Sequence, residues 1–134
     1  MFRSSHVLIV SADPVHHEKS DEIIRRLGLQ TLRCDSLMDA RARIEQQPFQ
    51  FVLCSDDLPD CNLRTAVSVL TSATAGAPVI VISHLADWDA YLKALGTGAF
   101  DYIAWPEDPG EMERIFRLAL EKNPPPRRAS HTAA

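Results

Sequence analysis

The chain lacks the features that mark several large classes of protein. It has no excess of basic residues, because its formal net charge is −4, whereas a nucleic-acid-binding surface needs a basic patch. It has no apolar run of membrane-spanning length, and the apolar run near its start is too short for the core of a secretory signal. We therefore expect partners that are neither nucleic acids nor membranes.

Cysteine is also scarce. Cys34, Cys54 and Cys61 are the only three, and they show no C-x-x-C spacing. An odd number of cysteines without a secretory signal indicates a reducing compartment, so we expect a cytoplasmic protein. Cys34 and Cys54 stand in apolar stretches and are predicted to be buried thiols.

The apolar residues that are present indicate a single α/β domain. They make up 46% of 134 residues, enough for one proper core. Runs of Val, Ile and Leu are continuous rather than alternating, which is typical of parallel strands buried on both faces. Strands are expected near residues 6–11, 30–34, 50–55, 78–83 and 100–104. Helices are expected near residues 14–27, 36–47, 62–75, 86–96 and 108–122. This alternation predicts a doubly wound parallel sheet over residues 1–123, followed by a disordered Pro/Arg/Ser/Ala tail over residues 124–134.

Several residues predict where the helices begin and end. Asp13 is a good N-cap before Pro14, Gly28 suits the position after a helix, and Ser36 can cap the second helix. In the last helix, one apolar stripe is expected to be buried. It consists of Met112, Ile115, Phe116 and Ala119.

Two motifs carry a family resemblance. Residues 51–60 read Phe-Val-Leu-Cys-Ser-Asp-Asp-Leu-Pro-Asp, and residues 98–106 read Gly-Ala-Phe-Asp-Tyr-Ile-Ala-Trp-Pro. Both resemble the receiver domain of bacterial two-component response regulators, in which the second motif is Gly-Ala-Asp-Asp-Tyr-Leu-x-Lys-Pro. The resemblance covers nearly the whole chain. It implies a flavodoxin-like (βα)5 sheet with strand order 2-1-3-4-5, and a cis peptide bond before Pro106.

The residues that carry receiver chemistry are replaced. The resemblance implies a phosphoacceptor aspartate where Ser55 stands, an acidic Mg²⁺-binding pair where Ser11 and Ala12 stand, and a lysine where Trp105 stands. Asp13 comes one place late for the acid pair. A serine hydroxyl without a neighbouring base is a poor nucleophile. Two motifs, residues 58–60 and Gly98-Ala99, fix the alignment independently, so these losses do not arise from a shifted register.

The switch positions of the family are kept. Ser83 ends the fourth predicted strand, where the resemblance implies a Ser or Thr, and Tyr102 matches the switch aromatic. In this fold the site lies beyond the carboxyl ends of the strands. The degenerate phosphorylation pocket is therefore predicted to contain Ser11, Ala12, Asp13, Ser55, Asp56, Ser83 and Trp105.

The pattern as a whole predicts a receiver-like domain that is not an enzyme, takes no cofactor or metal, and acts as a protein-interaction module in two-component signalling. The expected partner is a histidine kinase, another regulator or a second copy, with a possible homodimer through the fourth helix, fifth strand and fifth helix. Trp88, Tyr91 and Tyr102 are the predicted interface residues. Trp88 and Tyr91 belong to a stripe with Leu92 and Leu95 that is expected mostly to cover the sheet, and the sequence leaves open whether Trp88 is core or interface.

Other interpretations remain open from the sequence. Asp56, or Asp13 with Asp56, could replace the lost acids and support phosphorylation at a non-standard residue. Asp13 and His17 are spaced to share one helix face, as a metal pair could, although His16, His17 and His84 are expected to be ordinary surface histidines. A flavodoxin-like ligand-binding domain would need a phosphate-cradling loop after the first strand, and residues 11–16 do not provide one.

Overall fold

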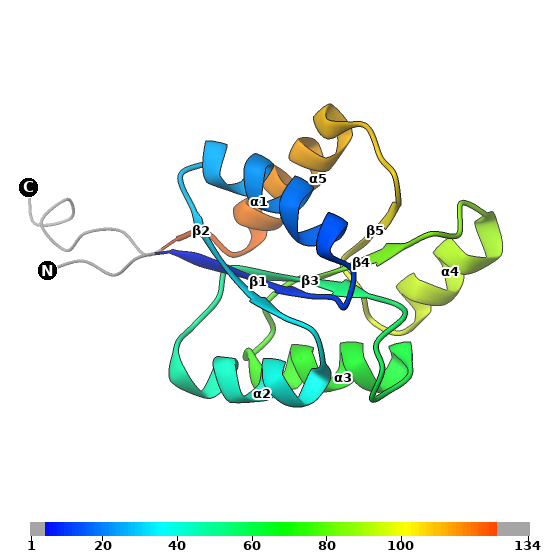
Figure 1. Cartoon of the computed structure of the whole chain (residues 1–134), viewed down its shortest axis with the longest axis horizontal. Helices are drawn as coiled ribbons and strands as arrows, with labels where there is room; N and C mark the ends of the chain where they lie inside the picture. Colours follow the sequence, from blue (N-terminus) through cyan, green and yellow to red (C-terminus); the bar gives the residue numbers. More distant parts are fainter. Residues whose placement is uncertain (1–4, 126–134) are drawn as a thin grey trace, which may run out of the picture.

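Strands and helices alternate strictly along the chain in the computed structural model, which describes residues 5–125 (Figure 1). The strands are β1 (His6–Val10), β2 (Gln30–Cys34), β3 (Phe51–Ser55), β4 (Val79–Ser83) and β5 (Asp101–Ala104). The helices are α1 (Pro14–Arg26), α2 (Leu37–Gln46), α3 (Leu63–Ala73), α4 (Trp88–Gly96) and α5 (Pro109–Lys122). Every predicted element is confirmed within about two residues at each end. Most of the predicted tail, residues 126–134, lies outside the described residues.

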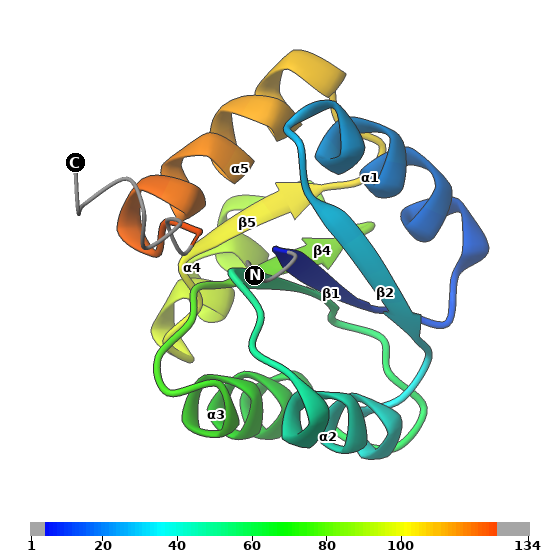
Figure 2. The same cartoon turned by 90° about the vertical axis from the view of Figure 1, so that its left-hand side faces the viewer.

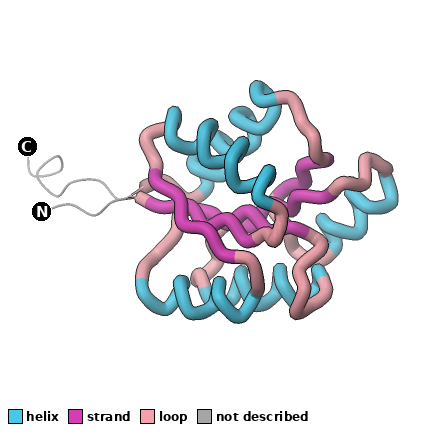
Figure 3. The backbone as a smooth tube through the Cα atoms, in the orientation of Figure 1, coloured by secondary structure: helices cyan, strands magenta, loops and turns pink. Residues whose placement is uncertain are grey.

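The five strands form one parallel sheet in the order β2-β1-β3-β4-β5, as the resemblance implied. The chain crosses from β1 outward to β2 and then back past β1 to β3, so the strand order reverses beside β1 and β3. All strands point the same way, and the loops that leave β3, β4 and β5 lie on the same side of the molecule (Figure 3). Sites in open α/β sheets form at such a reversal, beyond the carboxyl ends of the strands.

Helices cover both faces of the sheet. α1 and α5 lie over one face, and α2 and α3 lie over the other (Figures 1 and 2). Side chains of one strand alternate between these layers: Val7 and Ile9 face the first, while Leu8 and Val10 face the second. In the first layer Phe51 stacks on Phe116 with ring centroids 5.4 Å apart. The predicted α5 stripe of Met112, Ile115, Phe116 and Ala119 is buried there.

Local signals set the helix ends as predicted. The Asp13 carboxylate accepts a hydrogen bond from the Val15 backbone N–H at 3.0 Å, and Ser36 Oγ accepts one from the Asp39 N–H at 3.1 Å. Gly28 has a φ of +85°, the left-handed conformation that a residue without a Cβ adopts after a helix end. Asp13 and Ser36 follow β1 and β2 and so lie at the carboxyl edge of the sheet, whereas Gly28 precedes β2 and lies at the opposite edge.

α4 departs from the sequence prediction. Its stripe was expected mostly to cover the sheet, with Trp88 left open between core and interface. Tyr91 and Leu95 are half-buried, but Leu92 is 47% exposed and Trp88 is 69% exposed, and Ala94 is the only residue of the helix that is fully buried. The expectation is wrong for Leu92, because α4 lies beside the edge strand β5, where little sheet remains to be covered (Figure 2). The helix therefore leaves a large apolar surface exposed.

Cys34 and Cys54 are buried free thiols, as predicted. Burial raises the pKa of Cys34 to about 12 and raises that of Cys54 as well. Within residues 5–125, no helix is both long and apolar enough to span a bilayer.

Candidate functional site

The site lies in a hollow where the strands end. Ser11, Ser55 and Ser83 follow or close β1, β3 and β4, and all three are buried. Their positions confirm that the sequence motifs meet at one edge of the sheet. The hollow is lined by Ala12, Asp13, Pro14, His16, Ser55, Asp57 and His84.

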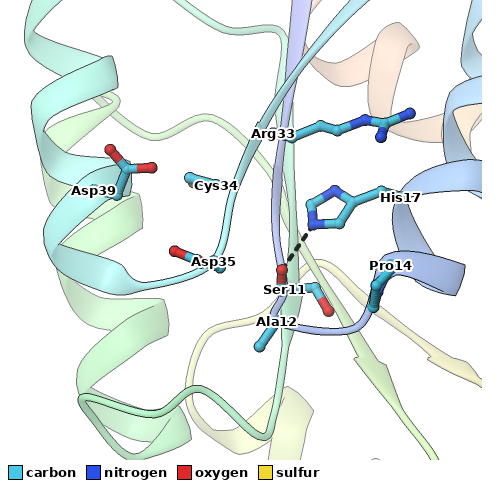
Figure 4. A pocket seen from close by; sticks show the side chains of 8 residues that line it. All are labelled: Ser11, Ala12, Pro14, His17, Arg33, Cys34, Asp35 and Asp39. Carbon is cyan, nitrogen blue, oxygen red and sulfur yellow. Dashed lines mark hydrogen bonds between the residues drawn. The ribbon is translucent and has the colours of Figure 1, made fainter.

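Ser11 organises the loop between β1 and α1. Its Oγ accepts a hydrogen bond from the Asp13 backbone N–H at 3.1 Å and is 2.8 Å from His16 Nδ1. His17 Nε2 donates to the Ser11 carbonyl oxygen at 2.7 Å (Figure 4). Where the resemblance implies Mg²⁺-binding carboxylates, this chain therefore has a serine held by two imidazoles.

The histidines correct the sequence prediction. His16, His17 and His84 were expected on the surface, but His16 and His17 are 1% and 7% exposed, and of these three only His84 is exposed. They are buried because the first turn of α1 packs over the end of β1, where Ser11 supplies hydrogen-bond partners to both rings. The suggested pairing of Asp13 with His17 is also wrong, since the His17 ring turns to the side of the loop near Arg33 (Figure 4).

His16 and His84 are the imidazoles that approach Asp13. His16 Nε2 lies 3.8 Å from Asp13 Oδ2, and His84 Nε2 lies 3.5 Å from the same oxygen. The Val15 N–H, followed by smaller effects of the two histidines, keeps the pKa of Asp13 below its usual value. Burial is the main cause that lowers the pKa of His16.

The third strand ends without a reactive group. Ser55 Oγ accepts a hydrogen bond from the Asp57 backbone N–H at 3.2 Å, and within residues 5–125 no histidine or carboxylate hydrogen-bonds to it. Asp57 lines the hollow, whereas Asp56 does not. Asp56 still lies close enough for its charge to act on His16. The carboxylates at the hollow are therefore Asp13 and Asp57 rather than the predicted Asp13 and Asp56.

The Trp105 indole packs against the His16 imidazole. The two rings meet edge to face, with centroids 4.9 Å apart and planes at 67°. The Trp105 side chain is partly buried against the layer formed by α1 and α5, and its backbone N–H donates to the Ser83 carbonyl at 2.6 Å. The peptide bond between Trp105 and Pro106 is cis, which confirms the implied conformation.

The two switch residues meet at the loop after β4. Ser83 Oγ accepts a hydrogen bond from the Leu85 backbone N–H at 3.0 Å, and the Tyr102 hydroxyl donates to the Leu85 carbonyl. Tyr102 is 9% exposed, and burial raises its pKa. Its ring meets Tyr91 edge to face at 5.9 Å, and Tyr91 stacks on Trp88 at 5.2 Å. Of the predicted interface residues, Trp88 thus lies on the surface, whereas Tyr102 is buried below the surface.

Sequence reasoning missed two roles. Asp60 of the Leu-Pro-Asp motif accepts hydrogen bonds from the backbone N–H groups of Leu37 and Met38, both at 3.0 Å, and so caps α2 across the sheet edge. The approach of His84 to Asp13 was also missed. No local sequence pattern predicts either contact, because both contacts join residues that are more than 20 positions apart in the chain.

The comparisons with known proteins agree with this geometry. The sequence model of the response regulator receiver domain matches residues 7–117. The chain is 29% identical over 118 residues to the response regulator protein PilR of Pseudomonas aeruginosa, covering 87% of this chain and 26% of PilR. It is 28% identical over 120 residues to the signal transduction histidine-protein kinase BarA of Escherichia coli, covering 88% of this chain and 13% of BarA. The chain thus spans about a quarter or less of these relatives.

Solved structures show the same fold. A crystal structure of a putative response regulator from Chloroflexus aurantiacus superposes with a TM-score of 0.81 at 23% identity, covering 89% of this chain and 99% of that one. The receiver domain of the sensor histidine kinase PA1611 from Pseudomonas aeruginosa superposes with a TM-score of 0.76 at 21% identity, covering 89% and 99%. That structure holds a magnesium ion in its active-site cleft. Together with the match over residues 7–117, the sheet order and the two motifs establish that this chain belongs to the response regulator receiver domain family.

Proposed function

We propose that this receiver domain works without an aspartyl phosphate and acts as a protein-interaction module in two-component signalling in the cytoplasm. The observation that carries the proposal is the set of groups at the carboxyl edge of the sheet. Ser11 and Ala12 follow β1, Ser55 ends β3, and Trp105 follows β5. The residues that the family uses for phosphoryl transfer are replaced together at all three places.

Phosphorylation at Ser55 lacks chemical support. A serine hydroxyl needs an adjacent general base or a metal to become a useful nucleophile. Ser55 is only 4% exposed, and the hydrogen bond to its Oγ comes from the Asp57 backbone N–H, which cannot take a proton. The geometry therefore supports a structural role for this hydroxyl, as the cap of the turn after β3.

Magnesium binding at the old site is also poorly supported. Mg²⁺ needs an octahedral shell of oxygen atoms, usually with one or two carboxylates. Of the two carboxylates at the hollow, Asp13 caps α1 through one oxygen and approaches two histidines through the other. Asp57 alone remains, so the charge that attracts Mg²⁺ in a working receiver is largely lost.

Tyr102 suggests which conformation the domain keeps. In typical receivers, phosphorylation draws the Ser or Thr and then the aromatic inward, which remodels the face formed by α4, β5 and α5. Here Tyr102 is already inward, with its hydroxyl bonded to Leu85 and its ring beneath Tyr91. We therefore propose that this face is held in the inward-aromatic form, or is shifted only by a partner.

The apolar surface of α4 and of the loop before it is the proposed contact region. Trp88, Leu85 and Leu92 are large apolar residues that are 69%, 55% and 47% exposed. Large aromatic residues dominate the energy of many protein interfaces. The proposed partner is a histidine kinase, another regulator or a second copy of this domain.

Beryllofluoride, a mimic of the aspartyl phosphoryl group, tests the loss of phosphoacceptor chemistry. We expect amide NMR spectra to show no saturable shifts near Ser55 or Asp57 when Mg²⁺ and beryllofluoride are added together. A parallel titration with Mg²⁺ alone separates metal binding from phosphoryl mimicry. Saturable, localised shifts that are abolished in the Asp57→Asn variant would identify Asp57 as a non-standard acceptor and refute the proposal.

A further inference from the structure

We infer that Asp13, His16 and His84 form a binding site for a divalent transition-metal ion, and that Zn²⁺ suits this set of ligands. The three residues come from the start of α1 and from the loop after β4, and they meet at the mouth of the hollow. Two imidazoles and one carboxylate are typical ligands of such ions, whereas Mg²⁺ prefers oxygen alone. This inference goes beyond the proposed function and does not depend on it.

The distances suit coordination. The ligand atoms of the three residues all lie within 4.8 Å of one another. Asp13 Oδ2 is 3.8 Å from His16 Nε2 and 3.5 Å from His84 Nε2. Ligands about 2.0–2.2 Å from a tetrahedral zinc ion lie roughly 3.3–3.5 Å apart. Small movements of the Asp13 and His84 side chains would therefore close the set, leaving a fourth position for water or another ligand.

His16 is already arranged as a ligand. Its side chain is 1% exposed, and its Nε2 has no hydrogen-bond partner among the described residues. Its Nδ1 is bound to Ser11 Oγ at 2.8 Å. Metal-binding histidines usually donate from their other nitrogen. With its proton on Nδ1, His16 would donate to Ser11 Oγ in the same manner, which would fix the ring and leave the lone pair of Nε2 toward the ion. A buried polar nitrogen without a partner is costly, and a metal ion would supply the missing partner.

The start of a helix normally disfavours a cation, and Asp13 offsets this effect. Like any ordinary aspartate, it carries a negative charge at neutral pH. One oxygen satisfies the helix cap while the other faces the histidines. Asp57 adds a second negative charge to the lining of the hollow.

A bound ion would connect α1 to the loop that leads into α4. His84 precedes Leu85, whose carbonyl oxygen accepts the hydrogen bond from Tyr102. Fixing His84 would therefore restrain the residues between Ser83 and the exposed Trp88. The metal site would thus act on the same surface that is proposed to contact partners.

Zinc binding can be measured by calorimetric titration of Zn²⁺ into the metal-free protein at neutral pH. Asp13→Asn keeps a residue that caps helices nearly as well as Asp, and His84→Ala removes an exposed side chain, so both variants should fold. We expect one zinc ion per wild-type chain. Each substitution should weaken binding by at least about tenfold, since loss even of a residue that only supports a ligand commonly costs 10–100-fold.

Two control variants each remove a potential zinc ligand that lies outside the cluster. His6→Gln and Cys61→Ser each delete a possible ligand outside the cluster and should leave the affinity unchanged. Imidazole ¹⁵N NMR should in addition show the His16 Nε2 signal shifting with zinc while Nδ1 stays protonated. Absence of saturable binding would overturn the inference. So would binding that survives both Asp13→Asn and His84→Ala, or binding that is lost in either control.

Discussion

Replacing Trp105 with alanine tests whether this residue stabilises the domain. The indole is partly buried against the layer of α1 and α5 and lies edge-on to the His16 ring. If it removes roughly 100 Å² of apolar surface from water, burial contributes about 2.5 kcal/mol at about 25 cal/mol per Å². Fully buried tryptophans lose about 3–5 kcal/mol on truncation to alanine, which sets the upper limit. We therefore expect Trp105→Ala to lower the free energy of unfolding by about 2–3 kcal/mol.

Urea denaturation followed by far-UV circular dichroism measures this change without depending on tryptophan fluorescence. Trp88→Ala is a matched control, because the chain has two tryptophans and Trp88 is 69% exposed. We expect its cost to stay below about 1 kcal/mol, most of it from lost stacking on Tyr91. Equal denaturant slopes in all three proteins would show that the midpoints report stability. A change within about 0.5 kcal/mol for Trp105→Ala would refute the packing argument and make Trp105 a candidate surface residue.

Three further predictions concern other parts of the molecule. If α4 contacts a partner, Trp88→Ala and Tyr91→Ala should reduce self-association in analytical ultracentrifugation or binding to a purified partner kinase, while unchanged behaviour in both assays would exclude this surface. Asp60→Asn should destabilise the domain at pH 7, because backbone N–H groups of α2 hold the pKa of Asp60 below its usual value. The carboxylate's contribution is complete above the unfolded-state pKa and is lost as the pH falls through the lower folded pKa. The stabilities of the two proteins in urea should therefore begin to converge as the pH falls below about 4 and become equal only below the folded pKa. A thiol reagent should modify the partly exposed Cys61 long before Cys54, whose burial raises its pKa, and equal rates would contradict the buried core described for β3.

Much of the fold could be predicted from local patterns. Continuous apolar runs identified β1, β3 and β4 because both faces of these central strands are covered by helices. Asp13, Ser36 and Gly28 predicted helix ends correctly, since capping depends on residues within one turn. The strand order came only from the family resemblance, because apolar periodicity does not say which strands are neighbours.

The predictions failed where packing at an edge decides burial. The stripe on α4 has the spacing of a core helix, yet Leu92 is exposed because α4 lies beside the last strand of the sheet. His16 and His17 were expected on the surface from their residue type alone. They are buried because Ser11, at the end of β1, offers both rings hydrogen bonds.

The sequence by itself predicted that the phosphotransfer groups of a receiver are replaced, because Ser55 and Trp105 stand in motifs that fix their own register. Only the tertiary structure decided which side chains lie together at the carboxyl edge of the sheet. The contact of Asp13 with His84 joins the start of α1 to the loop after β4, and it forms because the parallel sheet brings the ends of distant strands together. Such a contact depends on distances across the sheet, which no local pattern of residues encodes.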